Sequence, residues 1–198
     1  PIAAPKFGMV YDAGGKFDKS FNQSAFEGLQ RFSKETGVKV FEVQANSDTQ
    51  AEQVMRGLAR KKVDLIAAIG FSQTQAVQKV AREFPNVRFV LIDSVAQGAN
   101  IESVMFKEQE GSYLVGVASA MASKTKKLGF VGGMDIPLIR AFACGYGQGA
   151  KAQAPKAEII QNMVGTTAAA WNDPAKGGEL ARAQFDRGVD VVFAVAGG

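Results

Sequence analysis

Short runs of β-branched and aromatic residues alternate along the chain with longer segments whose apolar residues recur at helical spacing. The short apolar runs predict strands over residues 6–11, 38–43, 63–69, 87–92, 101–106, 127–131, 158–163 and 189–195. The segments between them predict helices over residues 20–35, 48–61, 72–84, 108–123, 137–152 and 174–187. This alternation is typical of βαβ units, in which right-handed crossovers build a mostly parallel sheet. The predicted fold class is therefore α/β.

The strand–helix pattern begins again after residue 123, which predicts two Rossmann-like lobes over residues 1–123 and 124–198. The second lobe has three predicted strands, and no helix follows the last of them. An open parallel sheet is covered by helices on both faces. We therefore expect the second lobe to be partial, either because the chain belongs to a longer protein or because self-association with another copy covers the sheet.

Residues that begin and end helices support these bounds. Ser20 and Gln23 have the spacing of a capping box, and Gly37 suits the end of the same helix. Pro137 falls in the first turn of a later helix, where its missing N–H is not needed.

The composition excludes several classes of protein. The chain has 198 residues, of which 46% are hydrophobic and 21% charged, and this is too apolar for a disordered protein. It has no His, so neither a Ser-His-Asp triad nor a His-ligated zinc site can form. Cys144 is the single Cys, and we interpret it as a small buried helical residue rather than a nucleophile. We expect no catalytic residue, no metal and no cofactor, and therefore no enzyme.

Charge and glycine spacing argue against nucleic-acid and nucleotide binding. The net charge is +4, and the short basic runs at residues 60–62 and 124–127 fall at predicted helix ends, where cations complement the helix dipole. A nucleic-acid surface would need a longer basic stripe with interleaved aromatic residues. The glycines at 145, 147 and 149 lack the G-x-G-x-x-G spacing and lie inside a predicted helix. We expect no nucleic-acid partner.

Ligands of open α/β sheets bind beyond the carboxyl ends of the strands. Residues in the segments expected there include three aromatics, two carboxylates and an amide, namely Phe17, Phe71, Trp171, Asp18, Asp93 and Asn22. Aromatic rings can stack on the face of a planar heterocycle, while carboxylates and amides hydrogen-bond with its edge. The combination predicts a small planar heterocyclic ligand.

These candidates also have structural alternatives. Phe17 could fold back on the core, and Asp18 could be a turn or helix-cap residue. Asn22 lies in the first turn of a predicted helix, where Asn often caps. Asp93 could hold a neighbouring loop, and Trp171 could anchor its own loop. The residue types alone leave these alternatives open.

Five stretches carry a resemblance to a known family. The motif Asp18-Lys19-Ser20-Phe21-Asn22 lies within GGKFDKSFN, and the others are FKEQEGSYLVG, FVGGMDIPLIRAF, WNDPAKG and VDVVFAVAGG. In this order they resemble the basic membrane protein family of ABC-transporter substrate-binding proteins, whose members with known ligands mostly bind purine nucleosides. The resemblance implies the type I periplasmic-binding-protein fold, with the ligand held between two lobes. It also implies that the chain continues beyond Gly198, where the groups that hold the ribose would lie.

The resemblance assigns a role to each candidate residue. Phe17 and Trp171 would stack on the two faces of the base. Asp18 and Asn22 would form hydrogen bonds with the edge of the base. The same first-lobe pocket would also contain Asp93 and, as part of its wall, Phe71.

The function implied by the resemblance is that of a solute-binding receptor of an ABC importer. It would be periplasmic or anchored to the cell envelope, and it would present a bound purine nucleoside to a membrane permease. No signal peptide is visible after Pro1, and a mature secreted protein and a cytosolic one would both look like this. The resemblance implies the secreted form, with the signal peptide absent from this chain. One alternative is a ligand-sensing domain of a regulator with the same fold. Another is a small α/β nucleoside-processing enzyme, against which the lack of His and of a G-x-S-x-G elbow counts.

Overall fold

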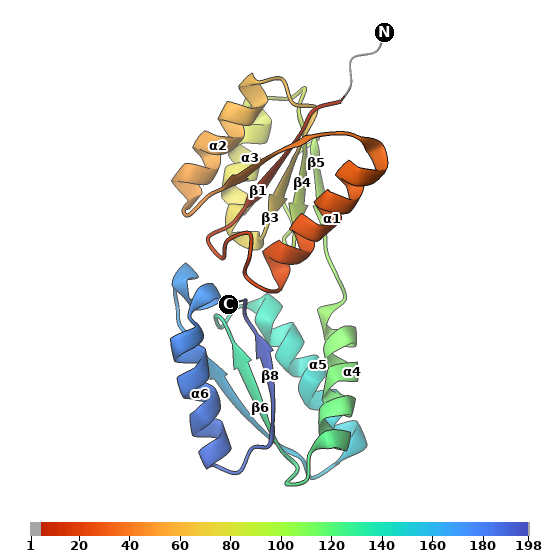
Figure 1. The fold of residues 1–198 in the computed structure, drawn as a ribbon, viewed down its shortest axis with the longest axis vertical. Coiled ribbons are helices and arrows are strands. Elements are labelled where there is room, and N and C mark those ends of the chain that lie inside the picture. Colours follow the sequence, from red (N-terminus) through yellow and green to blue (C-terminus); the bar gives the residue numbers. More distant parts are fainter. Residues whose placement is uncertain (1–4, 198) are drawn as a thin grey trace. The chain divides into compact units, whose positions relative to one another are not determined.

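The computed structural model describes residues 5–197 and divides into two compact units between Phe106 and Lys107. Each unit is a parallel β-sheet with helices on both of its faces (Figure 1). The predicted α/β fold class is therefore confirmed.

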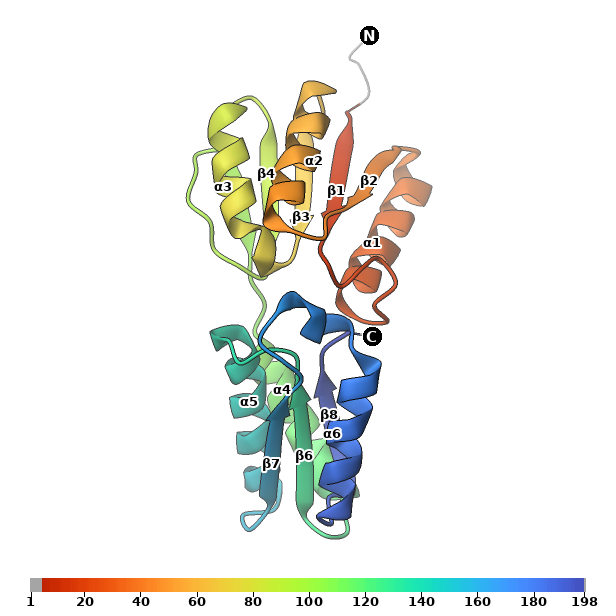
Figure 2. The same ribbon diagram turned by 90° about the vertical axis from the view of Figure 1, so that its left-hand side faces the viewer.

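The first unit alternates strands and helices around one sheet. Its elements are β1 (Phe7–Tyr11), α1 (Phe21–Thr36), β2 (Val40–Gln44), α2 (Asp48–Arg60), β3 (Leu65–Ile69), the 3-10 turn η1 (Phe71–Gln73), α3 (Thr74–Glu83), β4 (Arg88–Ile92) and β5 (Ile101–Val104). The strands are all parallel and lie in the order β2-β1-β3-β4-β5. Helices α2 and α3 cover one face of the sheet, and α1 covers the other (Figures 1 and 2).

The core of the first unit lies between the sheet and the pair α2 and α3. Alternate strand residues point to this face, and Val10, Ile66, Phe89 and Leu91 are each at most 1% exposed. Met55 of α2 belongs to the same buried cluster. Burying a side chain of this size contributes about 1.5–3 kcal/mol. This layer therefore supplies much of the stability of the first unit.

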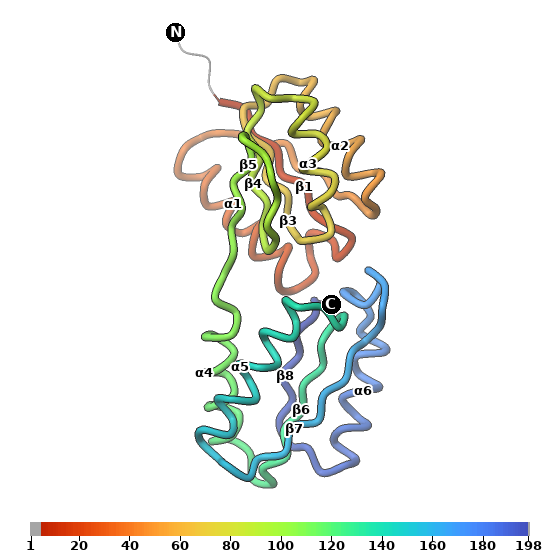
Figure 3. The backbone as a smooth tube through the Cα atoms, turned by 180° about the vertical axis from the view of Figure 1, so that it is seen from behind, coloured from red at the N-terminus to blue at the C-terminus, as the bar shows by residue number. Residues whose placement is uncertain are grey.

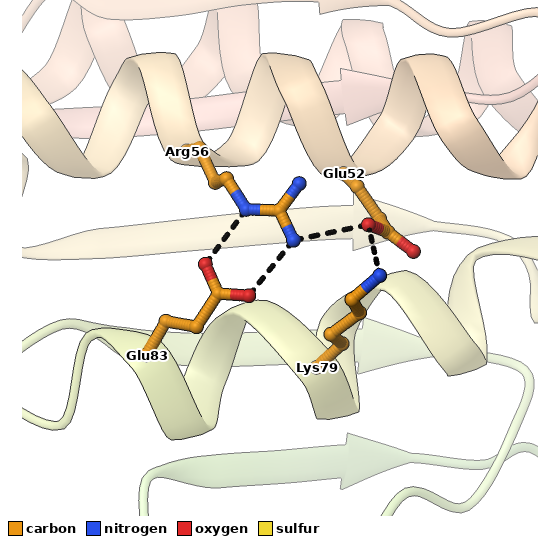
Figure 4. A network of polar contacts seen from close by, with 4 residues as sticks. All are labelled: Glu52, Arg56, Lys79 and Glu83. Carbon is orange, nitrogen blue, oxygen red and sulfur yellow. Dashed lines mark hydrogen bonds and ion pairs between the residues drawn. The ribbon is translucent and has the colours of Figure 1, made fainter.

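A network of charged side chains joins α2 to α3 on their solvent side (Figure 4). The guanidinium of Arg56 donates to both carboxylate oxygens of Glu83, at 2.7 and 2.8 Å, and to Glu52 Oε2 at 3.0 Å. Lys79 Nζ lies 2.8 Å from the same oxygen of Glu52. These hydrogen bonds hold the pKa of Glu83 and of Glu52 below the usual range of a glutamate. The two helices are thus linked both through the core and at the surface.

The second unit repeats the α/β arrangement around a smaller sheet. Its elements are α4 (Glu108–Ala122), β6 (Lys127–Gly132), α5 (Pro137–Gln153), β7 (Glu158–Met163), the 3-10 turn η2 (Ala168–Asn172), α6 (Pro174–Asp186) and β8 (Val191–Val195). The strands are parallel and lie in the order β7-β6-β8. Helices α4 and α5 cover one face, and α6 covers the other (Figures 1 and 2).

Helices α4 and α5 pack so closely that glycine is required at their contact. A Cβ atom on Gly116 of α4 would overlap the carbonyl oxygen of Tyr146, and one on Gly149 of α5 would overlap that of Tyr113. This packing assigns α4 to the second unit. The prediction that residues 108–123 belong to the first lobe differs from this, because the helix follows the last strand of that lobe in the sequence. The chain passes from one unit to the other in the segment between β5 and α4 (Figure 3).

Several local expectations differ from the structure. Ser20 precedes α1 but makes no side-chain cap bond, so the expected capping box does not form. Gly37 does end α1, with a φ of 72° and its N–H donating to Ser33 O. Cys144 is exposed, so its interpretation as a buried residue was wrong. It lines an open groove with Gln109 and Tyr113 of α4, which the sequence periodicity did not reveal.

The loop before β8 is tied to the turn between α4 and β6 by Asp190. One carboxylate oxygen accepts from Ser123 Oγ at 2.6 Å, and the other accepts from the N–H groups of Lys124 and Thr125 at 2.7 and 3.0 Å. These hydrogen bonds favour the charged carboxylate, and they lower the pKa of Asp190 to about 2. The carboxylate thus satisfies backbone groups that have no partner in a strand or helix.

Gly149→Ala should lower the free energy of unfolding of the full-length protein by about 1–3 kcal/mol, because its methyl group must push α4 away from α5. Gly147→Ala, on the same helix, is the matched control. A Cβ atom at Gly147 meets nothing within 4 Å, so this change should raise helix stability by roughly 0.5–1 kcal/mol. Urea unfolding followed by circular dichroism measures both effects, and similar values for the two variants would contradict the packing.

Asp190→Asn should destabilise the protein in a pH-dependent way. The pKa of Asp190 in the folded state, about 2, is below the value of roughly 3.9 expected in the unfolded state. The contribution of the carboxylate is therefore complete above the unfolded value and is lost as the pH falls toward 2. The melting temperatures of the wild type and the variant should differ at pH 7 and converge in acid. A difference that does not depend on pH would refute this role.

Candidate functional site

The strand order of the first unit reverses between β1 and β3. The chain goes from β1 to β2 on one side and then to β3 on the other side of β1. In doubly wound sheets, ligands bind at such a reversal, outside the carboxyl ends of the strands. The loops at this reversal are residues 12–20 after β1 and residues 70–73 after β3.

A buried amide holds these two strand ends together. Gln73 is 2% exposed, and its Nε2 donates to the carbonyl oxygen of Val10 in β1 at 2.8 Å and to that of Ile69 in β3 at 2.9 Å. Buried carbonyl groups need hydrogen-bond partners. Gln73 supplies one for each strand, so it also sets the spacing of the two loops that follow.

Asp18 is the residue that caps α1. Its side chain is 4% exposed, and Oδ1 accepts from the N–H groups of Ser20 and Gln23 at 3.0 and 3.2 Å, while Oδ2 accepts from the N–H of Asn22 at 2.9 Å. The first N–H groups of a helix have no acceptor within the helix. The structure therefore supports the helix-cap alternative for Asp18, and its contact with a ligand stays a prediction.

Asn22 connects the loop after β1 to α1. It is 1% exposed, and its Nδ2 donates to Asp12 Oδ1 at 2.8 Å and to Asp18 Oδ2 at 3.0 Å. Its Oδ1 accepts from the N–H of Asp12 at 3.3 Å. Both ends of the amide thus have partners in the loop. Asn22 would have to give up one of these hydrogen bonds in order to bond to a ligand, and that role also stays a prediction.

Asp12, directly after β1, is a further polar residue at this edge of the sheet, and it was not among the candidates predicted from the sequence. Burial raises the pKa of Asp12 above the usual range of an aspartate, although hydrogen bonds from Asn22 and from the N–H of Gly14 counteract the rise. Gly70 makes room for its carboxylate: a Cβ atom there would lie 2.5 Å from Asp12 Oδ2, and the φ of Gly70 is 111°. Only glycine adopts that conformation without strain. The position of Asp12 directly after a strand was the signal that could have identified it.

Phe17 presents its ring to solvent. The residue is 69% exposed, and its ring contacts the edge of the Phe26 ring of α1, with ring centroids 5.5 Å apart and planes at 83°. The alternative that Phe17 folds back on the core is therefore wrong. An exposed aromatic ring at the carboxyl edge of a parallel sheet is available for stacking.

Phe71 and Asp93 follow the two neighbouring strands, β3 and β4, at the same edge of the sheet. Phe71 is half-buried and begins η1. Thr74 Oγ1 lies 2.6 Å from the carbonyl oxygen of Phe71 and 2.8 Å from Ser94 Oγ, which links the two loops. Asp93 has a φ of 64°, a conformation that is uncommon for a residue other than glycine and that costs about 1–3 kcal/mol. Such strain is often found at functional sites.

Trp171 lies in the second unit, in η2, and is half-buried. Its indole ring lies against the backbone of Gly133, directly after β6, so closely that a Cβ atom on Gly133 would overlap the ring. The ring also packs against the buried hydrophobic cluster of the second unit, which includes Leu128 and Phe130. These contacts support the alternative that Trp171 anchors its loop, and stacking on a ligand stays a prediction.

The structure thus brings five of the six candidates to one edge of the first sheet and places Trp171 at the carboxyl edge of the second. Within residues 5–197 no three Asp, Glu or Cys side chains gather in a way that could hold a metal ion. In the same part of the chain, no helix is both long enough and apolar enough to cross a membrane.

Two parallel α/β units, together with the likeness to a solved solute-binding protein described below, place the chain in the type I periplasmic-binding-protein class. The chain belongs to the family of ABC transporter substrate-binding proteins described as PnrA-like, whose model matches residues 6–198. Its members are substrate-binding proteins and not enzymes. The resemblance to the basic membrane protein family is thereby confirmed.

Individual relatives agree with this assignment. A CD4+ T-cell-stimulating antigen of Listeria monocytogenes is 38% identical over 196 residues, which are 96% of this chain and 54% of the relative. The ABC transporter nucleoside-binding protein BmpA of Lactococcus lactis subsp. cremoris is 38% identical over 200 residues, with 98% of this chain and 55% of the relative covered. The chain spans about half the length of the curated relatives it matches.

A similar solved structure is that of an ABC transporter system solute-binding protein from Aeropyrum pernix K1. It is 31% identical to this chain, with a TM-score of 0.87. The superposition covers 98% of this chain and 55% of that protein. The likeness therefore extends over both units.

Asp18→Ala should lower the free energy of unfolding by about 1–2 kcal/mol, because N–H groups at the start of α1 lose their acceptor. Ser20→Ala is the matched control, since Ser20 stands at the start of the helix without a side-chain cap bond. It should change stability by less than about 0.5 kcal/mol. Urea unfolding of both variants tests the assignment, and a larger loss for Ser20→Ala would contradict it.

Proposed function

We propose that the full-length protein is the solute-binding receptor of an ABC importer and that its ligand is a purine nucleoside. Membership in the substrate-binding family supports the receptor role. The printed name of the relative from Lactococcus lactis, a nucleoside-binding protein, supports the choice of ligand. Such a receptor acts outside the cytoplasmic membrane, so we place it in the periplasm or on the cell envelope, with a membrane permease as its partner.

The observation that carries this proposal is the exposed Phe17 in the loop after β1, where the strand order of the first sheet reverses. The ring is 69% exposed, and it is held in a loop whose polar groups are largely bonded to one another. Stacking of a base on an aromatic side chain contributes about 1–3 kcal/mol. A purine would cover the ring and use hydrogen-bonding groups of the neighbouring loops to fix its orientation.

The proposal also gives ligand contacts to the other predicted site residues. Trp171 would stack on the ligand from the second unit. Polar contacts would come from the strand-end loops of the first unit, through Asp18, Asn22 and Asp93, with Phe71 in the wall of the pocket. A ligand that contacts both units favours the arrangement in which both contacts are made, and a permease could recognise that arrangement. Self-association through the second unit stays a prediction.

Calorimetric titration of the full-length protein with guanosine, inosine and adenosine tests the proposal. At least one nucleoside should bind. Phe17→Ala should weaken that binding about fivefold to a hundredfold, the equivalent of losing one stacking contact, while the melting temperature stays nearly unchanged because the ring is exposed.

Phe185→Ala is the matched control for this experiment. It removes another exposed ring, 49% exposed on α6, and should leave the affinity unchanged. Absence of binding by all three nucleosides would refute the choice of ligand. Equal losses in the two variants would refute the role of Phe17.

A further inference from the structure

The side chain of Lys16 lies among aromatic rings and a carboxylate, in the loop that carries Phe17. Its Nζ is 2.6 Å from Glu42 Oε2 on β2. It is also 3.9 Å from the centroid of the Phe26 ring on α1 and 5.6 Å from that of Phe17. The side chains of Lys16 and Glu42 are only 27% and 25% exposed. Lys16 is therefore unlike a surface lysine whose ammonium is surrounded by water.

The Phe17 ring needs support if it is to keep one orientation. With 69% of the residue exposed, few neighbours hold its side chain in one rotamer. A side chain that samples several rotamers loses conformational entropy when it becomes fixed. The edge contact with Phe26 and the ammonium of Lys16 are the contacts that restrict it. A cation near the face of an aromatic ring is attracted by the ring quadrupole, most strongly where water is partly excluded.

Glu42 in turn is held from inside the sheet. The hydroxyl of Tyr11 donates to Glu42 Oε2 at 2.8 Å, and Tyr11 is 1% exposed. Burial and the neighbouring carboxylate raise the pKa of Tyr11, so its hydroxyl keeps the proton that it donates. A chain of contacts thus leads from β1 through Tyr11, Glu42 and Lys16 to the exposed ring.

We propose that Lys16 is a positioning residue for ligand binding, whose ammonium, held by Glu42, fixes the Phe17 ring against Phe26 in the orientation that stacks on the ligand. This inference rests on the proposed function, because it takes Phe17 as the stacking ring. Its physical advantage is preorganisation: the rotamer freedom of the ring is lost on folding rather than on binding, so binding does not have to compensate for it.

Lys19, in the same loop, provides the matched comparison. It is exposed, and within the described part of the chain it has neither an ion pair nor a cation–ring contact. Replacing Lys16 or Lys19 by Met removes the same charge from the same loop. A difference between the two variants therefore reports the local contacts of Lys16 rather than long-range attraction.

The affinity of the full-length protein for the nucleoside that it binds best is measured for three variants. Lys16→Met should weaken binding by about fivefold to tenfold, the loss expected when one cation–ring contact no longer fixes the ring. Lys16→Arg should restore most of the affinity, since a guanidinium can also pair with Glu42 and stack on a ring. Lys19→Met should bind like the wild type.

A second measurement follows the ring itself, without any ligand. In the full-length protein with 13C-labelled phenylalanine, the Phe17 ring signals are assigned from their loss in Phe17→Leu. In the wild type and in Lys16→Arg, the chemical shifts of the ring should differ from those of a freely rotating phenylalanine. In Lys16→Met they should move toward the values of a freely rotating phenylalanine. This readout does not depend on the identity of the ligand, so it tests the positioning role even if no nucleoside binds and the proposed function fails.

Three results would overturn the proposal. The first is a Phe17 signal that is the same in the wild type and in Lys16→Met. The second is an equal loss of affinity in Lys16→Met and Lys19→Met, which would assign the effect to net charge. The third is wild-type affinity in Lys16→Met.

Discussion

The parallel pairing of β1 with β3 is the constraint on which the candidate site depends. Its register brings Val10 opposite Ala68, so the loop after β1 and the loop after β3 leave the sheet side by side. Gln73 strengthens this arrangement because a single buried amide group bonds carbonyls from both strands. The second unit uses the same device: Gln184 is 1% exposed, and its Nε2 lies 3.1 Å from the carbonyl oxygen of Phe130 in β6 and 3.3 Å from that of Ile160 in β7.

The polar and the aromatic residues of the loop after β1 differ in how far they are exposed. Asp18 and Asn22 are buried and bonded within their own loop and helix, since an unpaired buried polar group would cost about 1–3 kcal/mol. Their effect is to make the loop rigid. Phe17 is held by that rigid loop but keeps most of its surface exposed. The polar side chains of this loop thus turn inward, and an aromatic side chain is left exposed.

Much of the fold could be predicted because each strand and helix has its own periodic pattern. The alternation of apolar runs and helical segments gave the right element types and the parallel class of sheet. The unit boundary could not be placed this way, because α4 follows the last strand of the first unit in the sequence but packs on α5 through Gly116 and Gly149. The capping box expected at Ser20 was wrong for a similar reason, whereas the alternative that Asp18 is a helix-cap residue agrees with the structure. Ser20 has the expected type and spacing, yet the carboxylate of Asp18 takes the N–H groups of the first turn.

The sequence by itself determined the α/β class, the order of the elements, the family and the set of residues near the strand ends, since these depend on local periodicity and on motifs. Only the tertiary structure decided what each of those residues contacts and how far it is buried. Burial and hydrogen-bond partners are set by segments far apart in the chain: Glu42 of β2 meets Lys16, Gly70 makes room for Asp12, and Gly133 lies against Trp171. No local pattern encodes such contacts, because each exists only once the strands have paired.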